Sequence, residues 1–115
     1  MYRVLICGGR KYQDYDAVFR ALSALGKENI EVVIDGAALG ADLLGHKAAR
    51  ALGIPTLRFP AHWERDGRSA GVIRNQRMLD EGKPNIVLAF PAKESVGTWD
   101  MVRRARKLGL QVEVL

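Results

Sequence analysis

Five short apolar, β-branched runs alternate with helical patterns along this chain, and the alternation restricts its fold more than any other feature. The predicted strands are Tyr2–Cys7, Ile30–Ile34, Pro55–Phe59, Asn85–Phe90 and Gln111–Leu115. Near-continuous apolar runs of this length are typical of strands buried on both faces. Strands that alternate with helices form parallel sheets, because each helix carries the chain back across the sheet.

Four helical patterns separate the strands, and a glycine follows each. Asp14 lies where it can cap the first helix, in which Val18 and Leu22 recur at helical spacing. The other helices are predicted at Ala41–Leu52, Ala70–Glu81 and Thr98–Leu108, with Thr98 as an N-cap. The glycines expected in the left-handed turns that close these helices are Gly26, Gly53, Gly82 and Gly109.

These elements predict one α/β domain over residues 1–115. The expected architecture is a Rossmann-like three-layer α/β/α fold with a five-stranded parallel sheet in the order 3-2-1-4-5. In that order, the direction of strand succession reverses between the first and fourth strands. Ligands of such sheets bind at the carboxyl ends of the strands beside this switch point. The turns after strands one, two and four are therefore expected to converge on one cleft.

Glycine-containing turns follow these three strands, at Gly8–Arg10, Gly36–Asp42 and Gly97–Asp100. A glycine lets the backbone approach a ligand closely, and a helix start offers unpaired N–H groups to an anion. The sequence therefore predicts a phosphate-bearing ligand, either a nucleotide or a nucleotide-derived molecule. The predicted phosphate contacts are Gly8, Gly9, Arg10, Gly36, Ala37, Gly40, Gly97 and Thr98.

Four other side chains are candidates for binding the sugar or base. Asp42 is either a ribose-binding or general-base carboxylate, or an acid that stabilises the start of a helix. Arg74 and Asn75 offer several donors to phosphate, ribose or base, unless they form a solvated basic face. Trp63, in a long polar segment, either stacks on a base or anchors its loop. Asp42 and Arg74 are also weak catalytic candidates, and whether the protein is an enzyme stays open.

Other polar residues receive simpler interpretations. Asp100 is expected to cap the last helix, and His46 to be a packed or surface residue of the second. His62 is a weaker candidate for acid–base chemistry. Cys7 ends an apolar strand, where a small core residue is expected rather than a reactive thiol.

The net charge of +5 favours an anionic partner, although it does not distinguish a small phosphorylated ligand from nucleic acid. The basic run Arg103–Lys107 is either a solvated helix end or a polyanion contact. No apolar run approaches the roughly 20 residues of a membrane span, and a single cysteine makes no disulfide framework. No residues have metal-ligand spacing. We therefore expect a cytoplasmic protein without a metal or cofactor.

Taken in order, five segments resemble the SLOG superfamily of Rossmann-like proteins, and most closely its small stand-alone YspA/YpsA-like members from bacteria and phages. The segments are Gly8–Arg10, Gly36–Asp42, Phe59–Trp63, Ala70–Asn75 and Gly97–Thr98. The resemblance covers nearly the whole chain and implies a nucleotide-binding domain that senses or processes its ligand. Relatives with this fold often dimerise, which implies a homo-oligomer.

Two branches of this superfamily imply more specific functions. The stretch Gly36–His46 is similar to a segment of DNA-processing protein A, which binds single-stranded DNA. Arg74–Met78 and Gly97-Thr98 resemble two signatures of the Lonely Guy hydrolases, which cleave a nucleotide base from its ribose phosphate. Met101 stands at the position of their catalytic glutamate. Nucleotide binding, single-stranded DNA binding and N-glycosidic (phosphoribo)hydrolysis are therefore three open hypotheses.

Overall fold

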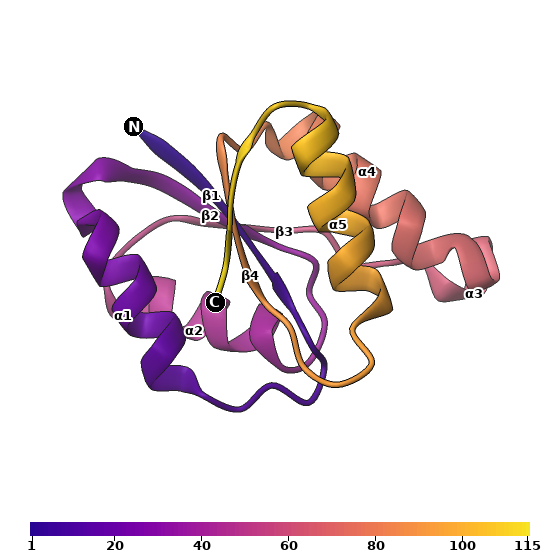
Figure 1. The fold of residues 1–115 in the computed structure, drawn as a ribbon, viewed down its shortest axis with the longest axis horizontal. Coiled ribbons are helices and arrows are strands. Elements are labelled where there is room, and N and C mark those ends of the chain that lie inside the picture. Colours follow the sequence, from indigo (N-terminus) through magenta and orange to yellow (C-terminus); the bar gives the residue numbers. More distant parts are fainter.

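The computed structural model describes residues Met1–Leu115 as a parallel sheet between two layers of helices (Figure 1). The sheet has five strands in the order β3-β2-β1-β4-β5, which confirms the predicted topology. The strands are β1 (Tyr2–Gly8), β2 (Ile30–Asp35), β3 (Thr56–Arg58), β4 (Ile86–Phe90) and β5 (Gln111–Val114). The helices are α1 (Tyr15–Leu25), α2 (Ala41–Ala51), α3 (Trp63–Asp66), α4 (Ala70–Gly82) and α5 (Val96–Lys107).

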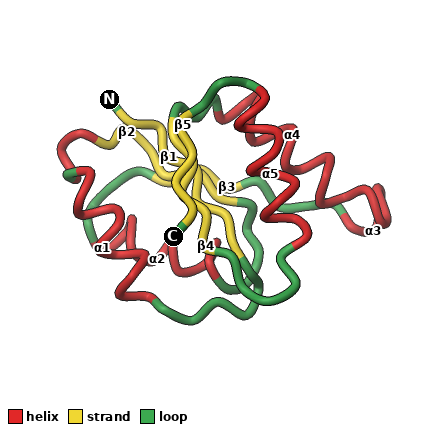
Figure 2. Tube along the Cα trace, in the orientation of Figure 1, coloured by secondary structure: helices red, strands yellow, loops and turns green.

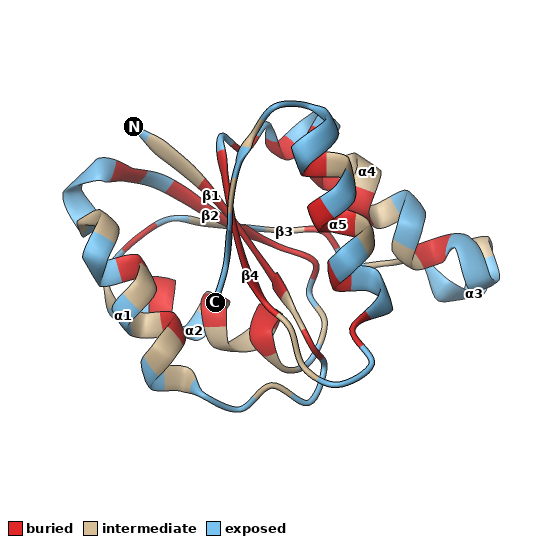
Figure 3. Ribbon diagram, in the orientation of Figure 1, coloured by how far each residue is buried: buried red, intermediate tan, exposed pale blue.

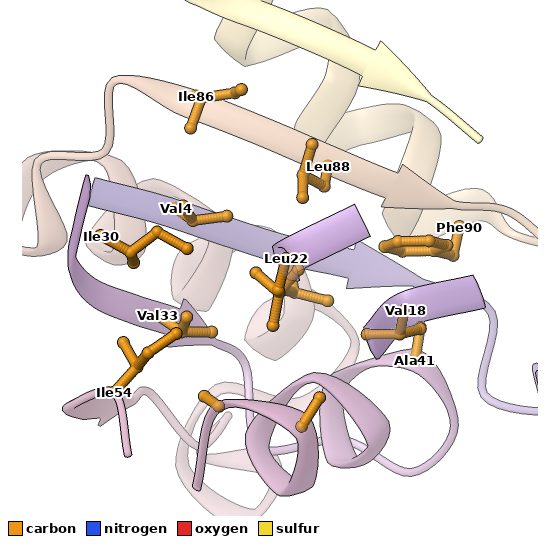
Figure 4. Close-up of a cluster of buried hydrophobic side chains, with 13 residues drawn as sticks. Val4, Val18, Leu22, Ile30, Val33, Ala41, Ile54, Ile86, Leu88 and Phe90 are labelled. Atoms are coloured by element: carbon orange, nitrogen blue, oxygen red, sulfur yellow. The ribbon is translucent and has the colours of Figure 1, made fainter. Parts of the chain in front are cut away.

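The central strands separate two hydrophobic cores because successive side chains of a strand point to opposite faces of the sheet. Val4 and Ile6 of β1 pack with α1 and α2, where Leu22 lies between the sheet and the helices (Figure 4). Leu5 and Cys7 pack on the opposite face with α4 and α5. Each fully buried aliphatic side chain contributes roughly 1.5–3 kcal/mol. The apolar run of β1 is therefore explained by burial on both faces.

The edge strand β5 departs from the prediction of strands buried on both faces. Gln111 and Glu113 are exposed, and Val114 retains 40% of its accessible surface. Figure 3 shows the contrast with the buried central strands. The prediction was wrong here because β5 is an edge strand that pairs only with β4. Its polar–apolar alternation is typical of a partly exposed strand.

The helix ends confirm most of the predicted signals. Asp14 caps α1, its carboxylate accepting the N–H of Ala17 at 3.0 Å. Positive φ angles occur at Gly26, Gly53 and Gly109. Gly82 is the exception, because it lies inside α4 and the left-handed residue is Lys83.

Close packing accounts for the glycine at position 82. A Cβ there would lie 3.3 Å from the Ile34 side chain, which is a tight contact, and 3.5 Å from Phe59, at ordinary van der Waals distance. The guanidinium of Arg3 also donates to the Gly82 carbonyl. Gly82 therefore brings α4 close to the sheet rather than terminating the helix.

The last long helix begins two residues earlier than predicted, so Thr98 is not its N-cap. Ser95 precedes the helix, but its hydroxyl bonds the N–H and carbonyl of Ala92 and makes no cap. Asp100 does not cap the helix either, because it accepts from Asn75 and Arg104. The early start leaves Thr98 buried in the first turn.

The polar segment after β3 folds into the short helix α3 and a 3-10 turn at Gly67–Ser69. Figure 2 shows α3 projecting beyond α4 at one end of the molecule. The loops that follow β1 and β4 run together at the carboxyl edge of the sheet, where the N–H of Gly9 donates to the carbonyl of Phe90 at 3.0 Å. None of the helices combines the length and apolarity that a membrane crossing requires.

Candidate functional site

A cleft of about 900 Å³ lies at the carboxyl ends of β1 and β4, at the predicted switch point. The turn after β1, the start of α2, the α3–α4 region and the loop before α5 all contribute to its lining. Most of the predicted site residues line it, and these are Gly8, Gly9, Arg10, Asp42, Trp63, Arg74, Asn75, Gly97 and Thr98. The structure thus brings together residues that are separated by up to ninety positions in the sequence.

The two glycines after β1 allow the ends of the central strands to meet. A Cβ on Gly8 would lie 2.3 Å from the carbonyl oxygen of Phe90, and one on Gly9 would lie 2.3 Å from the Cβ of Ala92. The helix that follows, α1, begins only at Tyr15. Gly8 and Gly9 therefore form a closely packed part of the cleft wall and do not start a helix that faces it.

Gly36, Ala37 and Gly40 do not line the cleft. The Gly36 carbonyl accepts from Arg74 Nη1 at 2.5 Å, so that side chain lies over the glycine. Gly40 has a φ of 75°, and a Cβ there would lie 2.1 Å from the Gly9 carbonyl oxygen. The Ala41 N–H also donates to that carbonyl, at 3.1 Å. Internal contacts therefore fill this turn and engage the first N–H group of α2.

Asp42 lies at the start of α2, where its carboxylate is buried and lines the cleft. The carboxylate accepts the N–H groups of Gly36 at 3.0 Å and Ala38 at 3.3 Å, which fixes the preceding turn. Burial and, to a lesser extent, the neighbouring charge of Asp35 raise the pKa of Asp42 to about 7, against the lowering effect of Arg74 and of its backbone hydrogen bonds. Asp42 therefore holds the β2–α2 turn in place and titrates near neutral pH.

Asp35, which the sequence analysis did not select, ends β2 beside Asp42. Its buried carboxylate pairs with Arg58 at 3.0 Å and accepts the N–H of Ala37 at 2.7 Å. Burial raises its pKa despite these bonds. The Nδ1 atom of His46 lies 4.0 Å from this carboxylate and has no hydrogen-bond partner. The position of Asp35, an acidic residue at the end of an apolar strand, was the sequence signal that could have identified this cluster of Asp35, Arg58 and His46.

Arg74 and Asn75 connect three elements, so the interpretation as a solvated basic face is wrong for this pair. Arg74 Nε donates to Asn75 Oδ1 at 3.1 Å, in addition to its bond to the β2–α2 turn. The buried amide of Asn75 donates to the Gly97 carbonyl at 3.1 Å and to Asp100 at 3.0 Å. Burial lowers the pKa of Arg74, which the nearby Asp42 partly offsets. The pair therefore holds α4 against the start of α5.

The first turn of α5 presents free donors to the cleft. The backbone N–H groups of Val96, Gly97 and Thr98 have no acceptor in the chain, and all three residues line the cleft. A Cβ built on Gly97 meets nothing within 4 Å, so the space beside it is open. These N–H groups carry the positive end of the α5 dipole. Among the three glycine turns, this one has open space beside its glycine and first-turn N–H groups without an acceptor in the chain.

Basic and aromatic side chains surround these donors. The cationic residues of the lining are Arg10, Lys11, Arg68, Arg74, Lys93 and Arg103, against the acidic residues Asp42, Glu94 and Asp100. The guanidinium of Arg10 lies 5.3 Å from the centre of the Trp63 ring, and Trp63 is 49% exposed. The cleft therefore combines positive charge with an exposed aromatic face.

The two histidines and the cysteine differ in their relation to this cleft. The His62 and His46 side chains do not line the cleft. Cys7 lies in its floor, where burial raises the pKa of the thiol and disfavours a reactive thiolate, so the prediction of a core cysteine is confirmed. No group of three or more His, Cys, Asp or Glu side chains is arranged to hold a metal ion.

The fold and the sequence both match known proteins. The fold is similar to that of DNA processing protein A from Streptococcus pneumoniae, with a TM-score of 0.75 and 20% identity over 96% of this chain. The chain spans 49% of that protein, about half its length. The sequence is 37% identical to the gene 61 protein of Mycobacterium phage D29, over 97% of this chain and 94% of that protein.

The family assignment follows from the sequence match. Residues 2–65 match the YspA, cpYpsA-related SLOG family, which is abbreviated YAcAr. This match covers more than half of the chain and includes the first two glycine turns. The expected resemblance to SLOG proteins is therefore confirmed, and the chain belongs to the YspA, cpYpsA-related SLOG family.

Proposed function

We propose that this protein binds a nucleotide or nucleotide-derived ligand in the cleft at the carboxyl ends of β1 and β4. The observation that carries the proposal is the open first turn of α5, whose free N–H groups at Val96, Gly97 and Thr98 lie in the same cleft as an exposed tryptophan. Three aligned donors at a helix start bind phosphate well. A phosphate group attached to a flat aromatic base satisfies both features.

The phosphate binds at the start of α5, where the backbone donors and the cleft's cations act together. Lys93 and Arg103 flank this turn and are both in the cleft lining. Neither forms an ion pair within the chain, so both are free to contact an anion. Charge-assisted hydrogen bonds of this kind are roughly twice as strong as neutral ones.

The base binds against Trp63, on the side of the cleft formed by α3 and α4. The Arg10 guanidinium already lies over this ring, which keeps one aromatic face in a defined place. Stacking of a base on an aromatic side chain is worth about 1–3 kcal/mol and accepts any base. Aromatic stacking therefore supports nucleotide binding in general and does not select the base.

A thermal-shift screen followed by calorimetry tests this proposal. Nucleoside mono-, di- and triphosphates, nucleotide sugars and dinucleotides are compared with inorganic phosphate and the free nucleosides. A ligand at a hundred times its Kd stabilises the native state by about 2.7 kcal/mol, which raises Tm by roughly 10 °C in a domain of this size. Shifts with nucleotides that exceed those with phosphate or nucleoside support the proposal, and no shift with any member of the panel refutes it.

A second candidate function is hydrolysis of the N-glycosidic bond of a nucleotide, and the state of Asp42 favours it. A carboxyl with a pKa of about 7 in a ligand cleft is suited to general acid–base catalysis. Water would add to C1′ of the ribose as the bond to the base breaks, and Asp42 would take the proton from water and pass it to the departing base. Chromatography of nucleotide incubations for free base tests this activity, with Asp42→Asn as the inactive control.

A further inference from the structure

A second hollow, of about 520 Å³, lies between α4 and α5 and continues the cleft. Asp100 and Arg103 line both hollows, so the two are contiguous along α5. In Figure 1, α4 and α5 lie side by side on the same face of the sheet. We call this hollow the α4–α5 groove, and its lining consists of Gln76, Leu79, Asp100, Arg103, Arg104, Lys107 and Leu108.

The charges of the α4–α5 groove are unevenly compensated. Arg104 donates to Asp100 at 2.9 Å and to Gln76 Oε1 at 2.7 Å, so its charge is paired and its side chain is held in place. Arg103 and Lys107 also line the groove, yet neither makes an ion pair or a side-chain hydrogen bond. Two cations that lie one turn apart on α5 are therefore available to an anion.

Stabilisation of the helix dipole does not by itself explain this arrangement. Cations in the last turn of a helix are favourable wherever they point, and Arg106 satisfies that requirement without lining either hollow. Arg103 and Lys107 instead face a groove whose other wall, α4, contributes a neutral amide and an aliphatic side chain. The groove therefore has positive charge on one wall and no opposing carboxylate on the other.

We propose that the α4–α5 groove is a second phosphate subsite and that the ligand is a phosphodiester-linked chain of at least two nucleotide units. This inference rests on the proposed function, because the first unit occupies the cleft. Gly97 and Lys107 lie ten residues apart on α5, about 15 Å along the helix axis. One phosphate cannot reach both positions. The chain would pass Arg103, which borders both hollows.

A ladder of deoxyadenylate ligands tests the groove separately from the cleft. Calorimetry compares the 5′-mononucleotide, the dinucleotide, the tetranucleotide and the octanucleotide on wild type, Lys107→Glu and Arg106→Glu. The Arg106→Glu variant is the matched control, since it reverses the same charge on the same helix outside both hollows. The length series also distinguishes a dinucleotide ligand from a longer strand. Affinity stops rising at two units for a dinucleotide ligand and continues to rise for a longer strand.

The expected result is a length-dependent effect of Lys107→Glu. It leaves mononucleotide affinity unchanged and weakens the longer ligands about 5- to 10-fold, whereas Arg106→Glu weakens them less than 2-fold. The slope of log affinity against log salt for the octanucleotide falls by about 0.7 for the lost phosphate contact. If mononucleotides bind but longer ligands bind no more tightly, or if Lys107→Glu and Arg106→Glu have equal effects, the proposed groove subsite is refuted and the proposed cleft site is not. No binding by any ligand overturns both proposals.

Discussion

Replacing Gly97 with aspartate separates ligand binding from stability more cleanly than any other change in the cleft. Gly97 is the second residue of α5, and a Cβ there meets nothing within 4 Å. Its φ is not in the left-handed region, so an L-residue fits its backbone. An acidic residue in the first turn of a helix is stabilising by about 0.3–1 kcal/mol, and removing a helical glycine adds a few tenths more. We expect Tm to stay constant or rise.

The same aspartate opposes a bound phosphate. Two unit charges 6 Å apart interact by about 2.8 kcal/mol at an effective dielectric constant of 20, which is a factor of about 100 in affinity. The new carboxylate also accepts the N–H groups of the first turn and so competes for the donors of the predicted phosphate site. We therefore expect Gly97→Asp to bind the best nucleotide of the screen about 100-fold more weakly than wild type.

Calorimetry and thermal unfolding measure the two effects on the same preparations. Gly97→Asn is the matched control, because it has nearly the same size and no charge, and we expect it to lose no more than a few-fold in affinity. Nucleotide affinity equal to that of wild type in a folded Gly97→Asp variant refutes the placement of phosphate at the start of α5. A large loss in both variants assigns the effect to size and also contradicts the electrostatic argument.

Three further predictions concern the buried carboxyl, the internal glycine and the aromatic wall. The folded pKa of Asp42 is raised to about 7, so its protonated form stabilises the fold fully below pH 4, and this contribution is lost as pH rises through 7. Asp42→Asn should therefore flatten the dependence of the unfolding free energy on pH between 4 and 8. Gly40→Ala should cost at least 2 kcal/mol more in chemical denaturation than Gly53→Ala, since both have positive φ but only Gly40 meets backbone atoms. With Trp99→Phe as background, nucleotides should quench Trp63 fluorescence, and inorganic phosphate alone should not.

The sequence was sufficient for the fold because its signals were redundant. The central strands of the sheet had apolar runs, and the intervening helices had periodic apolar faces, so the parallel topology followed from chain connectivity. The errors lay where a neighbour decides a residue's role. Gly82 belongs to α4, where Ile34 and Phe59 pack on it, and β5 is exposed because it is an edge strand without a further strand beside it. The local sequence around Gly82 and β5 shows neither the side chains that pack on the glycine nor the edge position of the strand.

The candidate site was predictable in position but not in the roles of its residues. The convergence of three turns followed from strand order, and the cleft lies where that order placed it. The bonds of Asn75 to Gly97 and Asp100 could not be foreseen, because they join residues more than twenty positions apart. Asp35 was missed for a similar reason. Its partners Arg58 and His46 come from separate elements that meet only in the folded chain.

The three glycine turns share a sequence signal but differ in what fills the space beside each glycine. At Gly9 and Gly40, a Cβ would collide with Ala92 or with the backbone of the neighbouring turn, so the chain itself requires glycine there. At Gly97, no atom of the protein lies within 4 Å of that position, and ordinary backbone angles would accept any residue. Packing therefore does not account for Gly97. The open space beside Gly97 and the N–H groups of the first α5 turn instead match the proposed phosphate contact, which the charge of Gly97→Asp would oppose and the neutral side chain of Gly97→Asn would largely tolerate.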